Sequence, residues 1–292
     1  MTNPLKSWFL LLLRCPDCAG LLAPAKEGLA CVDCGFRALG GHNLRPQRPK
    51  NKTMHFRRVM DCLPEDILPS IDLSTPVLTF AGPGAIRDSR ELMSEITARL
   101  PNGGDVLDLG CGQRDQSAPL EYLGFQYVGV DYSNPAADLF ADAHALPFAA
   151  ASFDCILSYA VLEHLHNPFL ALNEVARVMR PGAWFIGTVS QGEPFHSSYF
   201  HHTPWALVSL VGGIPQLRIR RLWPAFDTLA SLGNMGRYSR VLRGFLVCLD
   251  WLNTHLPWLT PRKMRWPALE QQLDRLYRAG SVCFAIEKIL QN

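Results

Sequence analysis

Apolar residues in this chain gather into short runs separated by stretches with a different, helical spacing. Runs of five to seven mostly apolar residues lie at 105–109, 127–131, 153–158, 184–189 and 281–287. A further possible strand, 217–222, has three apolar residues among three arginines. Runs of this length are typical of strands that are buried on both faces of a sheet. Helical stretches between several of the runs predict an α/β fold in which most strands are parallel.

Two segments have the three- and four-residue spacing of a helix with one apolar face. The first covers 88–100 and ends at Pro101-Asn-Gly-Gly104. The second begins at Asn167-Pro168, where asparagine caps the helix and proline takes its first position, and ends before Arg180-Pro-Gly182. The apolar positions of the first helix are Leu92, Met93, Ile96 and Leu100.

About sixty residues separate the segments 217–222 and 281–287, and they contain a further helical stretch at 237–256. The favoured interpretation is a helical insert that packs over a substrate site. The other interpretation is a helix that lies at a membrane interface against anionic lipid. The apolar positions of this stretch are Val241, Leu242, Phe245, Leu249 and Leu252, with Arg240 and Arg243 beside them.

The first apolar run leads through Asp108 into a glycine pair, Gly110 and Gly112, and the second run ends in Asp131. Glycine lets the backbone approach a ligand closely, because it has no Cβ atom and tolerates positive φ. Asp131 follows Gly112 by 19 positions, close to the offset at which an acid meets ribose hydroxyls. The pattern indicates a nucleotide-type ligand across the ends of two parallel strands.

The third glycine of a dinucleotide-binding loop is missing, because Arg114 and Asp115 follow Gln113. Asp108 repels a phosphate and suits a cation instead. With these residues, the chain resembles the class I S-adenosylmethionine-dependent methyltransferases (methyltransferase type 11 domain), whose Asp-Leu-Gly-Cys-Gly motif surrounds a positively charged ligand. The resemblance is strong from about Leu92 to Ser190.

This resemblance implies a seven-stranded, Rossmann-like α/β sheet. The run at 281–287 is expected to be its last strand, antiparallel at the sheet edge. The resemblance also implies that Asp108 faces the cationic part of S-adenosylmethionine and that Asp131 holds the ribose. Asp142 and Ala143 correspond to the residues that meet the adenine. The implied cofactor-binding residues are Asp108, Gly110, Gly112, Asp131, Tyr132, Asp142, Ala143 and Tyr159.

Histidines after two of the strands are candidates for a general base that deprotonates the acceptor. His164 belongs to a Glu-His pair after the run at 153–158, and an unperturbed histidine titrates near neutral pH. The alternative is a helix-start histidine held by the backbone. His196, His201 and His202 are rival candidates in a loop that faces the substrate or is purely structural, and their spacing matches no recognised metal site.

Four cysteines, in two pairs with the C-x2-C spacing, predict a structural Zn²⁺ site on a two-stranded ribbon. The ribbon resembles those at the front of some bacterial methyltransferases, including ribosomal RNA guanine methyltransferases. A ribbon that has lost its metal is the alternative. The proposed ligands are Cys15, Cys18, Cys31 and Cys34. The other cysteines are interpreted as buried thiols: Cys62, Cys111, Cys155, Cys248 and Cys283.

The net charge of +2 hides an uneven distribution, with net charges of +7 over 1–60, −12 over 61–213 and +7 over 214–292. Either the basic ends complement the acidic middle within the fold, or they attract an anionic substrate or surface. A basic stripe favours RNA, but no aromatic stacking platform accompanies it. The stripe consists of Arg45, Arg48, Lys50, Lys52, Arg57 and Arg58.

The expected organisation is a zinc ribbon at 1–46, a proline-rich linker or lid at 47–84 and a methyltransferase domain at 85–292. No apolar run approaches the 18 residues of a membrane span, and Trp8–Leu13 is too short for a secretory signal. A buried strand or helix is expected there. The protein is expected in the cytoplasm, and peripheral membrane contact stays open.

The predicted reaction is methyl transfer from S-adenosylmethionine to oxygen or nitrogen of a small molecule, such as a metabolite or a saccharide-type compound. The charged sulfonium is already a good leaving group, so only the acceptor needs deprotonation. The first alternative is methylation of ribosomal or transfer RNA. The second is a non-catalytic partner that binds the cofactor or another protein.

Overall fold

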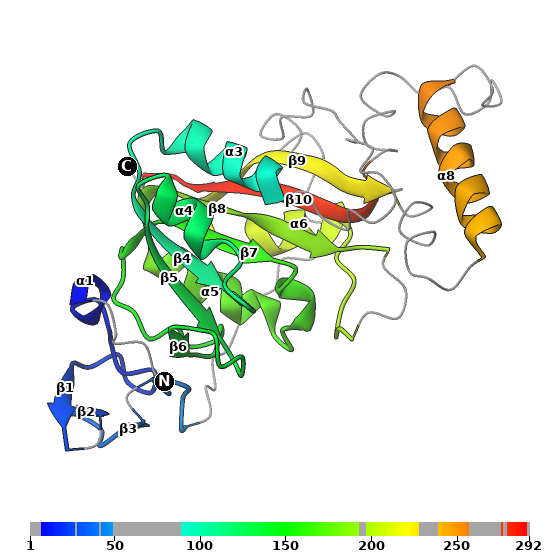
Figure 1. Ribbon diagram of the computed structural model, residues 1–292. Helices are drawn as coiled ribbons and strands as arrows, with labels where there is room; N and C mark the ends of the chain where they lie inside the picture. Colours follow the sequence, from blue (N-terminus) through cyan, green and yellow to red (C-terminus); the bar gives the residue numbers. More distant parts are fainter. Residues whose placement is uncertain are drawn as a thin grey trace.

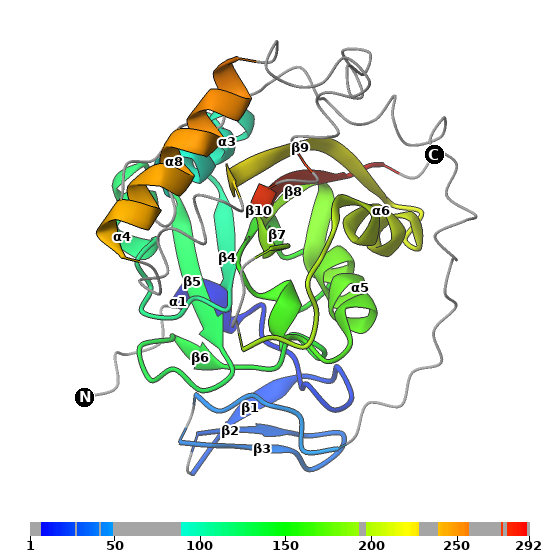
Figure 2. The ribbon, with the colours of Figure 1, turned by 90° about the vertical axis from the view of Figure 1, so that its right-hand side faces the viewer.

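The computed structural model describes residues 7–26, 28–40, 42–48, 89–192, 197–227, 239–256, 276 and 279–290. These residues form a small three-stranded sheet near the N-terminus and a seven-stranded sheet with helices on both faces (Figures 1 and 2). The predicted proline-rich linker lies outside the described residues from position 49 onward. Among the helices described, none is long and apolar enough to cross a membrane.

The large sheet has the strand order β6-β5-β4-β7-β8-β10-β9. Strands β6, β5, β4, β7 and β8 are mutually parallel, and β10 is antiparallel to both of its neighbours. The predicted α/β class and its seven-stranded sheet are confirmed. The strands are β4 (Asp105–Leu109), β5 (Gln126–Asp131), β6 (Leu139–Phe140), β7 (Phe153–Tyr159), β8 (Met179–Ser190), β9 (Leu217–Asp227) and β10 (Ala279–Lys288).

The predicted edge position of the last strand is wrong, because β10 lies between β8 and β9. Both faces of β10 are buried: Phe284 packs in the core on one side of the sheet and Cys283 in the core on the other. The edge strand β9 instead alternates: Leu217 and Ile219 are buried, and Arg218 and Arg220 are exposed. A strand that is apolar on both faces takes an interior position, and exposed charges protect an edge.

Helices cover the two faces of the large sheet (Figure 2), and buried residues form a core on each face. Ile96 and Leu120 bring α3 and α4 against one face, next to Val106 and Tyr127. Helices α5 and α6 pack on the other face. This arrangement places the strand tips between two rigid layers. The helices are α3 (Ser89–Arg99), α4 (Ser117–Tyr122), the 3-10 turn η3 (Leu162–His164), α5 (Pro168–Val178), α6 (Pro204–Gly212) and α8 (Arg240–His255).

The N-terminal sheet has one strand more than the two that were expected. Strand β2 (Gly28–Cys31) pairs with both β1 (Leu22–Ala25) and β3 (Arg37–Leu39), and all pairs are antiparallel. Ahead of the sheet, α1 (Ser7–Leu10) overlaps the segment 8–13 that was predicted as a buried element. Phe9 and Leu13 are buried, but Leu10 and Leu11 are 38% and 82% exposed, so the prediction is correct for only part of the segment.

The N-terminal module packs against the β6 side of the large sheet (Figures 1 and 2). Leu13 forms an antiparallel bridge with Phe148, and Asn43 forms a parallel bridge with Phe140 of β6. Beyond these bridges, the Arg45 guanidinium lies 5.2 Å from the ring centroid of Tyr132 and donates a hydrogen bond to the Tyr132 carbonyl. The module thus covers the free edge of β6 and contacts the loop after β5.

Three of the cysteines predicted to be buried thiols, Cys111, Cys155 and Cys283, are buried. Cys248 is exposed, so that part of the prediction is wrong. Its position in α8 explains the difference, because the exposed residues of this helix include most of its apolar positions. Cys62 lies outside the described residues.

Candidate active site

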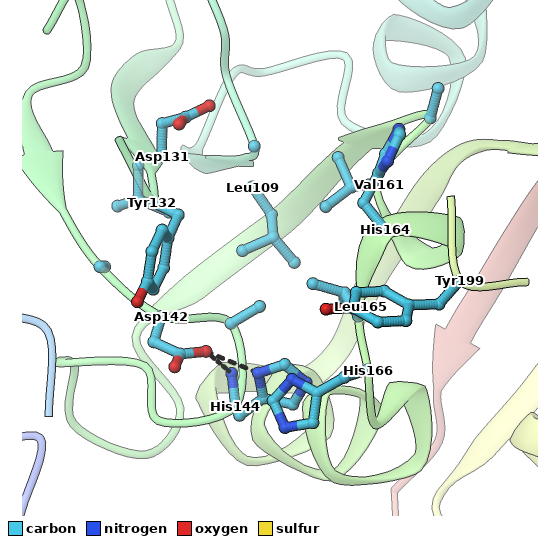
Figure 3. A pocket seen from close by; sticks show the side chains of 15 residues that line it. Leu109, Asp131, Tyr132, Asp142, His144, Val161, His164, Leu165, His166 and Tyr199 are labelled. Carbon is cyan, nitrogen blue, oxygen red and sulfur yellow. Dashed lines mark hydrogen bonds and ion pairs between the residues drawn. The ribbon is translucent and has the colours of Figure 1, made fainter. Parts of the chain in front are cut away.

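A cavity of about 570 Å³ opens where the parallel strands β4, β5 and β7 end (Figure 3). Its volume falls within the usual range for small-ligand sites. Carboxyl ends of parallel strands at a change of strand order are where α/β sheets bind ligands. The lining residues are Leu109, Gly110, Val130, Asp131, Tyr132, Ala141, Asp142, Ala143, His144, Ala160, Val161, His164, Leu165, His166 and Tyr199.

The glycine turn after β4 needs its glycines for two separate reasons. Gly110 has φ +70°, and a Cβ atom there would lie 2.5 Å from Val161 Cγ2. Gly112 has φ +51°, and its N–H donates to Asp131 Oδ2 over 3.2 Å. The turn therefore fits against the Val161 side chain and joins the tips of β4 and β5.

Asp131 ends β5 and lines the cavity (Figure 3). Its Oδ1 accepts the backbone N–H groups of Ser133 and Asn134, each at 2.9 Å. Together with the bond from Gly112, these contacts fix the carboxylate beside the cavity. Tyr132 follows it in the lining, with Arg45 over its ring.

Asp142 lies on the same side of the cavity as Asp131 and is bound by His144 (Figure 3). Its Oδ1 accepts from the His144 backbone N–H at 2.9 Å and from His144 Nδ1 at 2.6 Å. Burial alone raises the pKa of a carboxyl group, but these hydrogen bonds outweigh burial and lower the pKa of Asp142. Asp142 is therefore a carboxylate in the cavity wall at neutral pH.

The partners of His144 define its protonation. Its Nε2 accepts the Asn167 backbone N–H over 3.2 Å, and a backbone N–H can only donate. Nε2 therefore has no proton, and the neutral ring carries its proton on Nδ1, toward Asp142. The His166 ring packs on it, with the ring centroids 4.1 Å apart. His144 thus positions Asp142 and has no nitrogen left to act as a base.

Asp108 is placed differently from its predicted role. It is 2% exposed, does not belong to the cavity lining, and accepts a 2.7 Å hydrogen bond from the Tyr127 hydroxyl. Successive side chains of a strand point to opposite faces, so Leu109 reaches the lining and Asp108 turns away from it. Burial raises the pKa of Asp108 to about 7, although the bond from Tyr127 opposes the shift.

Replacing Asp108 with asparagine is expected to stabilise the ligand-free protein more at pH 8 than at pH 5. Because the folded-state pKa of about 7 exceeds the ordinary value of 3.8, the folded state binds the extra proton, and stability falls as pH rises between these values. At about 1.4 kcal/mol per pKa unit, the ionised carboxyl costs on the order of a few kcal/mol at pH 8. Asparagine keeps an acceptor for Tyr127 without this cost.

Urea unfolding at the two pH values measures the effect. Asp115→Asn is the comparison variant: Asp115 is exposed and is only a minor contributor to the raised pKa of Asp108, so we expect a much smaller change in stability. An equal gain in stability at pH 5 and pH 8 for Asp108→Asn would contradict the buried, strained carboxylate.

Among the candidate bases, His164 lines the cavity. Its Nδ1 lies 2.7 Å from the Ser197 carbonyl, which can only accept. The Nδ1 proton is thereby fixed, and in the neutral ring the basic lone pair is on Nε2. His164 thus has the tautomer that a general base at this position requires.

The other candidate histidines do not line the cavity in the described part of the chain. His202 is 3% exposed, its backbone N–H donates to Ser190, and burial lowers the pKa of its ring. His201 is exposed, and His196 lies outside the described residues. Tyr159, a predicted cofactor residue, precedes the lining residue Ala160 but is not itself in the lining.

Several lining residues had no predicted role, chiefly His144, His166 and Tyr199. His144 follows Asp142 by two positions. Because an aspartate side chain often accepts a hydrogen bond from the backbone two residues on, this spacing could have indicated the contact. Tyr199 and His166 come together only through the fold: the Tyr199 N–H donates to the Glu163 carbonyl at 2.8 Å and brings its ring to 6.5 Å from His166.

The four predicted metal ligands come together in the N-terminal module. The sulfur atoms of Cys15, Cys18, Cys31 and Cys34 all lie within 4.8 Å of one another. The Cys15–Cys34 and Cys18–Cys31 pairs are 3.5 Å apart, too far for a disulfide. A tetrahedron with metal–sulfur bonds of about 2.3 Å has edges of roughly 3.8 Å, so the cluster fits one Zn²⁺ ion.

Several known proteins with similar sequences are methyltransferases. The family description "Methyltransferase domain" matches residues 107–187. A demethylmenaquinone methyltransferase of Renibacterium salmoninarum is 29% identical over 211 residues, covering 63% of this chain and 87% of that protein. A ubiquinone biosynthesis O-methyltransferase of Cereibacter sphaeroides is 30% identical over 120 residues, covering 36% of this chain and 49% of that protein.

A solved structure of an S-adenosylmethionine-dependent methyltransferase from Methanosarcina mazei is 17% identical, with a TM-score of 0.44, and covers 68% of this chain and 98% of that one. The family match contains β5, β6 and β7 together with the glycine turn and the carboxylates Asp131 and Asp142. The family match and the sequence relatives support a class I S-adenosylmethionine-dependent methyltransferase domain in this chain.

Proposed function

We propose that this chain transfers the methyl group of S-adenosylmethionine to an oxygen or nitrogen atom of a small-molecule acceptor. The observation that carries the proposal is a single cavity with two different ends. Two carboxylates, Asp131 and Asp142, lie at one end, and His164 and Tyr199 lie at the other (Figure 3). One end suits the adenosine, and the other suits an acceptor that must lose a proton.

The residues at the strand tips fit the parts of the cofactor in turn. Asp131 would accept the ribose hydroxyls, Asp142 the adenine amino group, and the backbone at Gly110 would approach the amino acid part. When bound, the sulfonium supplies an activated methyl group. The protein's contribution is position and orientation, because the carboxylates are already fixed by their backbone and His144 contacts.

His164 is the residue we assign to the acceptor proton. Its Nδ1–H is held by the Ser197 carbonyl, which orients the ring beside the cavity. In His164→Asn, the amide nitrogen replaces Nδ1 as donor to Ser197, whereas the Nε2 position is lost. We expect kcat to fall by about 10²- to 10⁴-fold, the usual contribution of general base catalysis, with unchanged cofactor affinity.

Single-turnover transfer and calorimetric binding of S-adenosylhomocysteine separate these two quantities. His201→Asn is the matched control, because His201 is exposed, lies in the segment that contains Ser197 and does not line the cavity. A normal kcat in His164→Asn would show that His164 is not the general base. Catalysis would then come from the proximity of the acceptor to the cofactor.

For the acceptor, we infer an aromatic compound with a hydroxyl group, of the kind that occurs in quinone synthesis. Near His164 the cavity offers the ring of Tyr199 and the aliphatic Val161 and Leu165. The His166 ring adds to this wall, with its centroid 6.5 Å from that of Tyr199 and 4.1 Å from that of His144. Such walls suit a flat, largely apolar ring better than a saccharide, which needs many polar partners. Two of the similar proteins are named for demethylmenaquinone and ubiquinone synthesis, which supports this class.

The contacts of two basic residues weigh against the RNA alternative. Arg45 donates to Asn43 and lies over Tyr132, and Arg48 donates to the Cys34 carbonyl. These arginines connect parts of the protein, and they are thereby less available to phosphates. Lys50, Lys52, Arg57 and Arg58 lie outside the described residues.

The experiment that tests the function is transfer of labelled methyl groups to fractionated cell extract by the purified full chain. We expect label in the small-molecule fraction that partitions into organic solvent. Label in RNA would replace the proposal with the RNA alternative. Saturable cofactor binding without label in any fraction would indicate a non-catalytic partner.

We also propose that the cysteine cluster holds a structural Zn²⁺ ion. Four thiolates close the coordination shell, which leaves no position for substrate. Gly35, with φ +78°, follows the second pair and permits the tight turn of the knuckle. The ion would stabilise the module that covers β6 and contacts Tyr132 through Arg45.

A further inference from the structure

Helix α8 leaves large apolar side chains exposed. The exposed fraction is 83% for Val241, 41% for Leu242, 57% for Phe245 and 39% for Leu249. At about 100° per residue, these four positions fall within an arc of roughly 100° on the helix. A globular helix normally buries such a face, and a continuous apolar surface marks an interaction site.

The sequence around α8 is basic and rich in tryptophan. Residues 237–265 contain six Lys/Arg and one acid, Asp250. Trp251 lies within the helix and is 44% exposed, and Trp258 and Trp266 follow in the sequence. Exposed apolar residues, an excess of positive charge and tryptophan together are typical of a helix that lies in the surface of an anionic membrane.

The sheet topology places this insert at the edge where the cavity opens. Ser190, at the end of β8, pairs with Ser281, and Ala279 pairs with Asp227, at the end of β9. Tyr159 of β7 pairs with Thr188 of β8, so all these residues belong to the carboxyl edge of the parallel strands. The chain between β9 and β10, which includes α8, therefore leaves and re-enters the sheet at the cavity edge.

Figure 1 shows α8 on the side of the molecule toward which β9 runs, away from the N-terminal module. With 16 residues and charged positions within it, α8 is too short and too polar to span a bilayer, which takes about 20 apolar residues. A position in the plane of the membrane surface suits both its length and its one-sided apolar arc.

We propose that the exposed face of α8 docks this protein onto an anionic lipid surface and turns the cavity edge toward the membrane. The acceptor is then a lipid-soluble compound that reaches the cavity from the bilayer. This second statement rests on the proposed function, whereas the docking does not. The docking explains why apolar residues and basic charge occur together in the segment that joins β9 to β10 at the cavity edge.

The test is flotation of the full chain with vesicles of phosphatidylglycerol and phosphatidylcholine, compared with phosphatidylcholine alone. We expect binding to the anionic vesicles that falls at least tenfold in the double variant Phe245→Ser/Leu249→Ser. Tyr122→Ser is the matched control, since it removes an aromatic residue of α4 that is 91% exposed, and its binding should equal that of the wild type.

Binding of S-adenosylhomocysteine is measured for each variant, so that a folding defect or a failed cofactor site is recognised separately. Unchanged flotation in the double variant, or no flotation of the wild type, would overturn the docking. So would a wild-type dimer without vesicles that the double variant converts to a monomer, because a second copy then covers the face. If the wild type binds vesicles but the methyl label from the transfer experiment appears only in water-soluble products, the docking stands and the proposal of a lipid-soluble acceptor is wrong.

Discussion

Asp131→Ala is expected to weaken S-adenosylhomocysteine binding by about 10- to 150-fold, corresponding to the roughly 1.5–3 kcal/mol of a hydrogen bond to a charged group. Asp131 lines the cavity at the tip of β5. It also accepts the N–H groups of Gly112, Ser133 and Asn134, so alanine removes a ligand contact and loosens the glycine turn together.

Asp131→Asn keeps part of these contacts. Its amide oxygen still accepts from Ser133 and Asn134, whereas its amide nitrogen cannot accept from Gly112, so the charge and one of the three bonds are lost and we expect a smaller loss of affinity than in Asp131→Ala. Asp115→Ala, at an exposed acid of the neighbouring turn, serves as the control. Calorimetry measures all three variants, and near-wild-type affinity of Asp131→Ala would remove the ribose assignment.

Cys31→Ser is expected to release zinc and to unfold the N-terminal module. Structural zinc contributes roughly 10–16 kcal/mol of apparent binding free energy in zinc-finger peptides, and this energy stabilises the fold. Here the consequences extend further, because Phe9, Leu13, Phe36 and Leu44 of the module are buried in the core of the large sheet. We therefore expect a lower unfolding temperature for the whole protein.

Metal content per chain and thermal unfolding are the measurements. Cys248→Ser is the matched control, because its thiol is exposed on α8 and remote in sequence from the cluster. Since Arg45 lies over Tyr132, the Cys31→Ser variant should also bind S-adenosylhomocysteine more weakly. One zinc ion per chain in Cys31→Ser would be incompatible with the four-thiolate site.

Residues close in the sequence could be interpreted without the structure. The spacing of the cysteines predicts a cluster that the structure brings together, and the glycine pair marks a turn with positive φ at both positions. Asp131 and Asp142 line one cavity, as expected of carboxylates at consecutive strand ends. In each case the geometry depends on residues that lie in one turn or in strands that follow each other in the sequence.

Contacts between distant segments could not be predicted in the same way. Asn167 sets the His144 tautomer across 23 positions, and Arg45 reaches Tyr132 across 87 positions. The role of His164 depends on Ser197, which the fold brings to its ring. No local pattern specifies these partners, because they depend on how α5, η3 and the N-terminal module pack.

By itself, the sequence determined the α/β class, the parallel strand tips, the cysteine cluster and the methyltransferase family. These depend on residue periodicity and on backbone conformations available to particular residues. Only the tertiary structure decided that β10 lies inside the sheet, that Asp108 is buried against Tyr127, and that His144 holds Asp142. Strand order, burial and protonation depend on neighbours that the chain supplies only when folded.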